Sequence, residues 1–213
     1  MNDQNYVHPV IRVGKRLFDV VGASFGLLAS IPLIPVIALA IKLDSRGPVF
    51  FRQSRIGRAW PHYVELFMMI KFRTMRVDAE KTGGAQWARK QDPRVTRVGY
   101  WLRKTRLDEI PQLLNVLRGE MSLIGPRPER PAFYQKLENA IPFYAERTFG
   151  VSPGITGLAQ VYQGYDETIE DVRSKLAYDH AYALVLSQPG RWIMSDMHIL
   201  YRTIAVVVCG RGQ

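Results

Sequence analysis

The hydrophobic pattern is uneven, with one long apolar run near the N-terminus and shorter segments after it. Residues 20–41 carry no charge, and about twenty apolar residues suffice to cross a hydrocarbon core of roughly 30 Å. Pro32 and Pro35 interrupt this run, and each proline removes a backbone donor and clashes with the preceding turn. The pattern therefore predicts a membrane helix over residues 11–44 that breaks at Pro32, next to Ile31.

Basic residues flank the apolar run on both sides, with Arg12, Lys15 and Arg16 before it and Lys42 and Arg46 after it. Because cytoplasmic flanks carry the excess of Lys and Arg, a helix that enters the bilayer and returns keeps both clusters on the cytoplasmic side. A simple bitopic span and a buried helix of a soluble core stay open as alternatives. A signal peptide is poorly supported, since a basic stretch follows the run instead of a small-residue cleavage site.

The rest of the chain alternates short strands and helices. We expect strands at 49–53 and 64–70 joined by a turn region at 57–61, a mobile loop at 77–92 and a turn-rich loop at 152–157. Helices are expected at 95–104, 129–146 (broken at Pro142) and 166–187, with an amphipathic helix at 192–208 that packs on the core or attaches to a surface. The predicted fold class is α+β, mostly helical: a flexible N-terminus (1–10), a re-entrant membrane helix (11–44) and one domain (45–213) with a short β-hairpin.

Candidate chemistry centres on the adjacent carboxylates Asp108 and Glu109, which precede Pro111. Proline is tolerated only in the first turn of a helix, so we expect a helix to begin at 107–108 and to end at Gly119. The positive end of the helix dipole favours ionised acids there. Acids in a first helical turn are also common capping residues, which is the structural alternative.

Several cations surround this acid pair in the sequence. Arg103 and Arg106 lie just upstream, and Arg127 is held between two prolines, Pro126 and Pro128. Anions beside so many fixed cations indicate chemistry on a phosphate.

Composition points to an anionic partner. The formal charge is +10 and the pI is about 9.9, but the basic residues do not form the long tract of a nucleic-acid-binding tail. We therefore expect no nucleic-acid partner. The single cysteine, Cys209, excludes an intramolecular disulfide and a Cys-based zinc site, and the four histidines show no metal spacing.

With these residues in place, the chain resembles the monotopic phosphoglycosyl transferases, the bacterial sugar transferase family of polyprenyl-phosphate hexose-1-phosphate transferases. The segments that match the family cover nearly the whole chain in order: Lys15–Asp19, Pro32, Gly47–Gln53, Lys71–Met75, Leu107–Leu113, Met121–Pro128 and Pro153–Gly157. The chain departs from the family at two positions: Ile31 stands where relatives often have serine, and Ser152 where they often have a cation.

The resemblance implies two-step phosphoryl transfer. Asp108 would attack the sugar-bearing phosphate of a UDP-sugar, UMP would leave, and polyprenyl phosphate would resolve the aspartyl phosphosugar. The implied catalytic pair is Asp108 and Glu109, with Mg²⁺ anchored by Asp108 or Glu109. The expected phosphate-binding residues are Arg103 and Arg127, followed by Lys71 and Arg73.

The same resemblance implies partners and a location. They are a UDP-sugar donor, undecaprenyl phosphate as acceptor and inner-membrane lipid, at the cytoplasmic face of the bacterial inner membrane, in the first membrane step of a surface glycan (exopolysaccharide) pathway. The identity of the sugar and homodimer formation stay open. Two other classes remain, a non-catalytic membrane-tethered basic binding protein and a metal-dependent sugar-nucleotide hydrolase.

Overall fold

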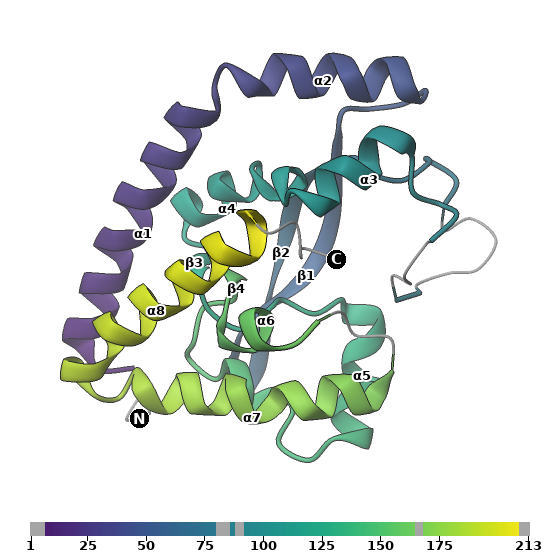
Figure 1. Ribbon diagram of the computed structural model, residues 1–213. Helices are drawn as coiled ribbons and strands as arrows, with labels where there is room; N and C mark the ends of the chain where they lie inside the picture. Colours follow the sequence, from purple (N-terminus) through teal and green to yellow (C-terminus); the bar gives the residue numbers. More distant parts are fainter. Residues whose placement is uncertain (1–6, 80–85, 88–91, 165–167, 209–213) are drawn as a thin grey trace.

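The computed structural model describes residues 7–79, 86–87, 92–164 and 168–208. The fold is α+β and mostly helical, as predicted (Figure 1). Its elements, in chain order, are α1 (Pro9–Ser30), α2 (Leu33–Asp44), β1 (Phe50–Trp60), β2 (Tyr63–Phe72), α3 (Arg97–Lys104), the 3₁₀ turn η1 (Leu107–Glu109), α4 (Gln112–Arg118), β3 (Ser122–Ile124), α5 (Pro131–Ala140), the 3₁₀ turn η2 (Ala145–Thr148), β4 (Gly154–Thr156), α6 (Leu158–Tyr162), α7 (Ile169–Val185) and α8 (Pro189–Val208).

The predicted break in the apolar segment is confirmed. Helices α1 and α2 meet at Ile31–Pro32 with a bend of 62°, and the rest of the described chain lies inside the bend (Figure 1). The Ser30 hydroxyl donates to the Gly26 carbonyl at 2.6 Å, a back-bond that bends helices. In the described chain, no helix is by itself long and apolar enough to cross a bilayer, whereas this bent pair together meets that test.

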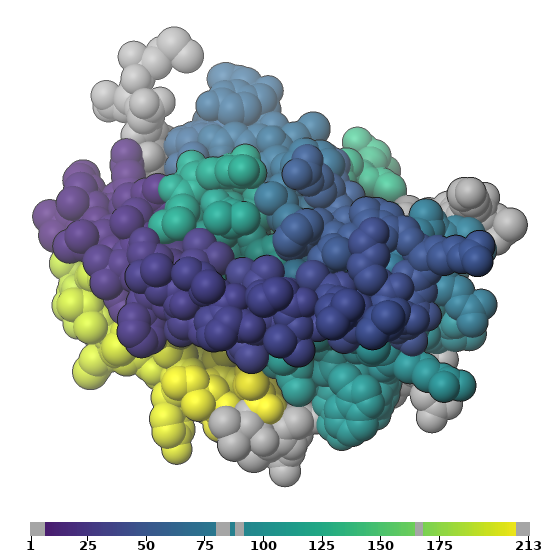
Figure 2. All heavy atoms as spheres, turned by 90° about the horizontal axis from the view of Figure 1, so that it is seen from above, coloured from purple at the N-terminus to yellow at the C-terminus, as the bar shows by residue number. Residues whose placement is uncertain are grey.

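The outer face of the helix pair is apolar over its whole length. The space-filling view shows α1 and α2 as one purple-to-blue band across this face (Figure 2). So long an exposed apolar stripe marks a surface that meets a partner or a membrane, which agrees with the re-entrant interpretation. Its exposed side chains are Val10, Val13, Leu17, Val21, Phe25, Leu28, Ile31, Leu33, Val36, Leu39 and Leu43.

The hairpin is longer than the pattern predicts. Strands β1 and β2 pair antiparallel, and β1 continues to Trp60, so the predicted turn at 57–61 is wrong and the turn lies at Pro61–His62. The register shifts between Ile56 and Ala59, so Gly57 marks an irregularity inside the strand instead of its end. Glu65 holds the extension, because it accepts from Arg58 Nε at 2.9 Å and Trp60 Nε1 at 3.0 Å.

The turn-rich segment 152–157 contains a strand that its residue pattern does not predict. Strand β4 pairs parallel with β3, with Gly154 opposite Ser122. A Cβ on Gly154 would lie 2.1 Å from the Gly125 backbone nitrogen, so the glycine permits this close approach. Gly154–Thr156 in this turn-rich segment therefore form a strand, and the residues around them form the loop.

The remaining helices shift by a few residues at their ends. The predicted 129–146 helix ends at Ala140 in the structure, and 145–148 is a separate 3₁₀ turn. Helix α7 begins with a capping box between Thr168 and Asp171, and α8 begins at Pro189, three residues before the predicted start. Most of the predicted mobile loop, including 80–85 and 88–91, lies outside the described residues.

One buried polar cluster joins α1 to the main core. Lys15 Nζ donates to Asp196 Oδ2 at 2.9 Å, to the Tyr182 hydroxyl at 2.8 Å and to the Ile124 carbonyl at 3.2 Å. The Tyr182 hydroxyl in turn donates to Asp196 Oδ1 at 2.9 Å. This Lys15 cluster (Lys15, Tyr182 and Asp196) ties α1, α7 and α8 together inside an apolar core that includes Ile11.

Candidate active site

The acid pair lies in a 3₁₀ turn before the helix. Asp108 and Glu109 belong to η1, and α4 begins only at Gln112, so the predicted helix start at 107–108 is four to five residues early. Arg106 adopts a left-handed conformation with φ of +57°, which separates α3 from the turn and strains a residue with a side chain. The predicted end at Gly119 is confirmed, with φ of +83° at the C-cap.

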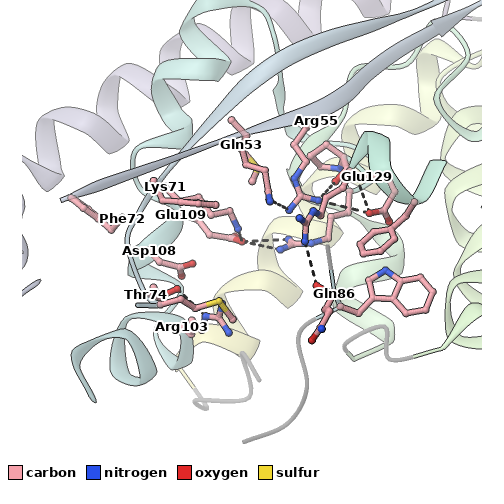
Figure 3. Close-up of a pocket in the computed structure, with 18 of the residues that line it drawn as sticks. Gln53, Arg55, Lys71, Phe72, Thr74, Gln86, Arg103, Asp108, Glu109 and Glu129 are labelled. Atoms are coloured by element: carbon pink, nitrogen blue, oxygen red, sulfur yellow. Dashed lines mark hydrogen bonds and ion pairs between the residues drawn. The ribbon is translucent and has the colours of Figure 1, made fainter. Parts of the chain in front are cut away.

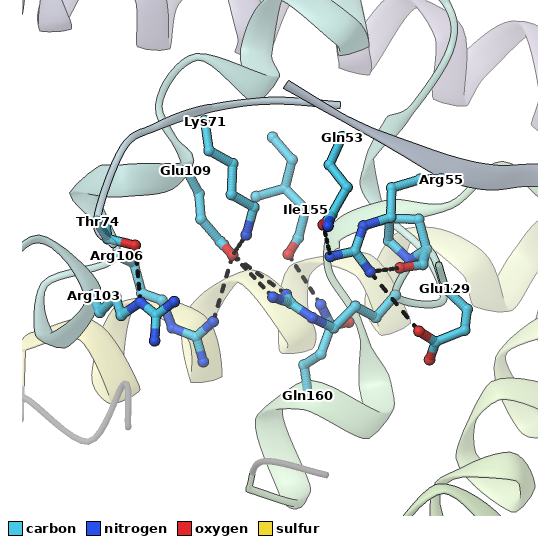
Figure 4. Close-up of polar contacts among 12 residues, drawn as sticks. Gln53, Arg55, Lys71, Thr74, Arg103, Arg106, Glu109, Glu129, Ile155 and Gln160 are labelled. Carbon is cyan, nitrogen blue, oxygen red and sulfur yellow. Dashed lines mark hydrogen bonds and ion pairs between the residues drawn. The ribbon is translucent and has the colours of Figure 1, made fainter. Parts of the chain in front are cut away.

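Glu109 lies at the centre of a cation cluster (Figure 4). Its Oε1 atom accepts from Lys71 Nζ at 2.9 Å and from both terminal nitrogens of Arg127 at 3.3 Å, and Arg106 Nη1 lies 3.7 Å away. Burial alone raises a carboxyl pKa, but Lys71, Arg127 and Arg106 together hold the pKa of Glu109 well below its ordinary range. Glu109 is therefore ionised at neutral pH and gathers three cations at one point.

Asp108 has the opposite environment. Its side chain is buried, and its Oδ1 atom has no hydrogen-bond partner among the described residues. Burial raises the pKa of Asp108; Lys71 opposes that shift and the neighbouring Glu109 charge adds to it. A buried acceptor without a partner is rare and costs stability. The two acids therefore differ: Glu109 is an anion bonded to cations, whereas one oxygen of Asp108 has no hydrogen bond.

Arg103 lies beside Asp108, as the sequence predicts. Its Nε donates to the Thr74 hydroxyl at 3.0 Å, which fixes the guanidinium at this end of the site. A Cβ on Gly99 would lie only 2.0 Å from the Thr74 carbonyl oxygen, so the glycine is what lets α3 approach the end of the hairpin.

Arg73 lines the same cavity as the acid pair, but its side chain is held by bonds outside that pair. Its guanidinium turns away from the acid pair and caps the end of α2, donating to the carbonyls of Arg46 at 2.6 Å and Ser45 at 2.7 Å. It also donates to the Ser45 hydroxyl at 3.0 Å. These bonds engage its terminal nitrogens and join the hairpin to the helix pair, so contact of Arg73 with phosphate stays a prediction.

Lys71 reaches Glu109 because Asn115, which the sequence analysis did not select, holds the hairpin against α4. The buried Asn115 Oδ1 accepts from Ile70 N at 3.1 Å, and its Nδ2 donates to Met68 O at 2.8 Å and to Glu120 Oε2 at 2.6 Å. A polar residue between Leu114 and Val116 was the available signal in the sequence.

The Pro-Arg-Pro segment is held at three successive carbonyls. Gly154 N donates to Pro126 O at 2.8 Å, Arg147 Nη2 to Arg127 O at 3.1 Å and Arg55 Nη1 to Pro128 O at 3.1 Å. Arg147 also pairs with Asp179 of α7 at 2.9 Å, which ties the segment to that helix. No local pattern marks Arg55 or Arg147, since their partners lie far away in the sequence.

These groups line one cavity of about 410 Å³. Asp108, Thr74 and Arg103 lie at one end, Lys71 and Glu109 lie next, and Gln86 and Glu129 lie at the other end (Figure 3). The arrangement offers a carboxyl group with one unpartnered oxygen beside several fixed cations: the cations can hold a phosphate group and the carboxylate can attack it.

The acid pair offers few ligands for a metal ion. The described residues contain no group of three or more His, Cys, Asp or Glu side chains able to hold a metal ion. Mg²⁺ needs only one or two carboxylates when substrate phosphates complete its shell, and the unpartnered Oδ1 of Asp108 fits that need. Glu109 Oε1 fits less well, because Lys71 and Arg127 already bond to it.

Comparison with known proteins gives consistent matches. A family model described as bacterial sugar transferase matches residues 10–210. The chain is 42% identical over 204 residues to a UDP-N-acetylgalactosamine-undecaprenyl-phosphate N-acetylgalactosaminephosphotransferase of Aeromonas hydrophila, covering 96% of this chain and 46% of that protein. It is also 43% identical over 203 residues to an undecaprenyl-phosphate glucose phosphotransferase of Komagataeibacter xylinus, covering 93% of this chain and 36% of the relative.

A third relative is covered more fully. The chain is 44% identical over 192 residues to a UDP-glucose:undecaprenyl-phosphate glucose-1-phosphate transferase of Caulobacter vibrioides, covering 89% of this chain and 68% of that protein. The chain thus spans less than half of the first two relatives and about two thirds of the third.

Proposed function

Because this chain belongs to the bacterial sugar transferase family, we propose that it transfers a sugar-1-phosphate from a UDP-sugar to undecaprenyl phosphate. All three relatives are named as phosphosugar transferases of undecaprenyl phosphate, and two of the names include the UDP-sugar. We place the reaction at the cytoplasmic face of the inner membrane, where UDP-sugars are available and where both basic flanks of the helix pair are favoured.

The observation that carries the proposal is the contrast between the two acids. Glu109 concentrates Lys71, Arg106 and Arg127 at one point, while Asp108 Oδ1 stays without a partner beside them. A carboxylate approaching a diphosphate meets strong repulsion, and fixed cations lower that barrier where charge develops. The cation cluster would hold the diphosphate while Asp108 remains available to attack.

In the first step, an Asp108 carboxylate oxygen forms a bond to the sugar-bearing phosphorus. The bond from that phosphorus to the bridging oxygen breaks, and UMP leaves with the electron pair. In the second step, a phosphate oxygen of the lipid attacks the same phosphorus and the Asp108 carboxylate leaves. No oxidant or reductant is needed, and Asp108 returns to its starting state.

The bent helix pair explains how the second substrate would arrive. The lipid keeps its tail in the bilayer and its phosphate at the interface, and the apolar stripe of α1 and α2 would sit in that bilayer. Arg73 bonds the hairpin to the end of α2, and Lys71 lies two residues earlier. The membrane segment and the phosphate site are therefore mechanically joined.

Asp108 would hold Mg²⁺ through its unpartnered oxygen. When bound, the ion would neutralise phosphate charge and favour departure of UMP. It would also favour the ionised form of Asp108, which burial disfavours.

The deciding experiment measures UMP release from a UDP-sugar with and without undecaprenyl phosphate. The proposal predicts a release limited to about one UMP per protein molecule without lipid, sustained turnover with lipid, and neither with Asp108→Asn. A hydrolase would turn over without lipid and liberate sugar phosphate. A non-catalytic binding protein would release no UMP in either case, and either outcome would contradict the proposal.

A further inference from the structure

The cavity has two chemically different ends. One holds Asp108 and Arg103, while Gln86 and Glu129 lie at the opposite end (Figure 3). There the rings of Trp87 and Phe133 pack with centroids 5.2 Å apart and planes inclined by 43°. The guanidinium of Arg130 lies 5.3 Å from the Phe133 ring and donates to the Gln86 carbonyl at 3.3 Å. We call Trp87, Phe133 and Arg130 the aromatic end.

We propose that the aromatic end binds the uracil ring of the donor nucleotide. This inference rests on the proposed function, because it assigns part of the same substrate to part of the same cavity. It names Trp87 and Phe133 as the residues that recognise the base.

The direction of the reaction supports this placement. In phosphoryl transfer the attacking and leaving oxygens lie roughly in line on opposite sides of the phosphorus. With Asp108 as the attacking group, the departing UMP must extend away from Asp108. That direction leads past Glu109 toward Glu129 and Gln86 (Figure 3). The aromatic end lies there, because Trp87 follows Gln86 in the chain and Arg130 donates to the Gln86 carbonyl.

The sugar takes a different direction under the same geometry. Its oxygen is bonded to the attacked phosphorus but is not the leaving group, so it lies to the side of the line between Asp108 and UMP. The end of the cavity opposite Asp108 is thus better placed for the base than for the sugar.

The chemistry of the aromatic end fits a flat base with carbonyl edges. Aromatic side chains stack on bases with about 1–3 kcal/mol per base, and Arg130 adds a planar cation beside Phe133. The indole nitrogen of Trp87 is buried and has no hydrogen-bond partner among the described residues. An indole N–H is a donor only, and each ring carbonyl of uracil is an acceptor.

The test is equilibrium binding of radiolabelled UMP to the full chain in lipid nanodiscs. Trp87→Leu and Phe133→Leu keep apolar volume against the core around Leu137 but remove the aromatic face. Each should raise the Kd for UMP by roughly tenfold, as expected for lost stacking. Trp87→Phe keeps a ring and loses the N–H, so its Kd should rise by a smaller factor than that of Trp87→Leu.

Tyr63→Leu serves as the matched aromatic control, because Tyr63 is exposed at the hairpin turn and lies outside the cavity lining. Its UMP binding should stay within twofold of the unmodified chain. Thermal unfolding of every variant establishes that the folded state is being measured. If folded Trp87→Leu and Phe133→Leu variants bind UMP normally, the inference is overturned; a changed preference among UDP-sugars would then assign the aromatic end to the sugar.

UMP binding and sugar-phosphate transfer are separate readouts, so together they distinguish this inference from the proposed function. UMP binding is measured in the Asp108→Asn background, where no transfer is expected, and transfer is measured in the unmodified chain. If UMP binding depends on Trp87 and Phe133 but no transfer occurs in the unmodified chain, the proposed function fails and the base site stands. If transfer occurs and UMP binding ignores both residues, the base site fails and the proposed function stands. Absence of UMP binding to the unmodified chain overturns the base site.

Discussion

Lys15, which is buried, and Lys71, which is half-buried, each pair with a buried carboxylate at 2.9 Å, and their surroundings differ in how many polar groups have partners. Lys15 Nζ donates three hydrogen bonds, to Asp196, Tyr182 and Ile124 O, and the Tyr182 hydroxyl donates to the other carboxylate oxygen of Asp196. Lys71 pairs with Glu109 in a site that also holds Arg106, Arg127 and the unpartnered Asp108 Oδ1.

The difference teaches how to separate a structural ionic cluster from a functional one. Both contain a cation and an acid, so residue type does not distinguish them. The Lys15 cluster is saturated and lies in an apolar core, whereas the Lys71 site faces a cavity and leaves one acid unmatched. A buried group without a partner costs free energy, and a ligand that supplies the partner recovers it.

The largest expected effect comes from Asp108→Asn. Transfer should fall by roughly 10⁴-fold or more, as losses of a covalent nucleophile do. The melting temperature should stay equal or rise, because burial disfavours the ionised Asp108; a gain of about 1 kcal/mol corresponds to roughly 2–4 °C for a chain of this size. If Asp108→Asn has a lower melting temperature and still transfers the sugar phosphate, Asp108 is a structural residue and the contrast between the two sites fails.

The second effect compares the two lysines directly. Lys15→Met leaves Asp196 buried without its cation and should cost about 3–5 kcal/mol of unfolding free energy. Lys71→Met leaves Glu109 with Arg127 and Arg106 and should cost about 1–2 kcal/mol. Urea unfolding of both variants measures these two losses of unfolding free energy.

The control for this comparison is the double variant Lys15→Met with Asp196→Asn. It removes both charges and should recover most of the lost stability, since the unpaired charge causes most of the cost. Equal losses of unfolding free energy for Lys15→Met and Lys71→Met would contradict the proposed difference between a fully bonded structural cluster and a site that has polar groups left for a ligand.

Arg127→Lys should lower kcat/KM by roughly 10–100-fold, because lysine cannot present the planar pair of donors that Arg127 offers. Stability should be nearly unchanged, since the surrounding segment is held through its backbone carbonyls. Arg118→Lys is the matched control, because Arg118 is exposed and lies outside the cavity. If both variants lose activity equally, the Arg127 fork has no special role.

The smallest effect is in the pH dependence of stability. The pKa of Glu109 is lowered from 4.5 on folding, so its contribution is present above about pH 4.5 and is lost as pH falls through the folded value. The pKa of Asp108 is raised from 3.8, so its contribution is full below that value and is lost as pH rises through the folded value. Each unit of difference is worth about 1.4 kcal/mol.

Single variants separate these two contributions. Glu109→Gln should reduce the loss of stability that occurs as pH falls below about 4.5. Asp108→Asn should remove the loss of stability that occurs as pH rises above 3.8. Melting temperatures between pH 3 and pH 8 measure both. Parallel curves for the unmodified chain and both variants would contradict the assigned pKa directions.

The sequence predicts the parts of this fold that depend on local pattern. The break at Pro32, the existence of the hairpin and the helix end at Gly119 all follow from periodicity, proline and glycine. Long-range partners decide the rest. Strand β4 exists because β3 pairs with it across the sequence, and Arg73 turns away because the end of α2 offers it carbonyls.

The division between the acids was also out of reach of the sequence. Helix-end electrostatics predicts that both are ionised, whereas Asp108 is buried without a partner and Glu109 collects the cations. That outcome depends on Lys71 from the hairpin and Arg127 from the Pro-Arg-Pro segment, which the tertiary fold brings together.

The most direct test of the account is intact-mass analysis of the chain mixed with a UDP-sugar in the absence of lipid acceptor. The unmodified protein should gain the mass of one phosphosugar, with fragmentation placing it on Asp108, and undecaprenyl phosphate should remove it. Asp108→Asn should gain nothing. An adduct that persists in Asp108→Asn, or sustained transfer by the unmodified protein with no adduct at any time, would contradict the account.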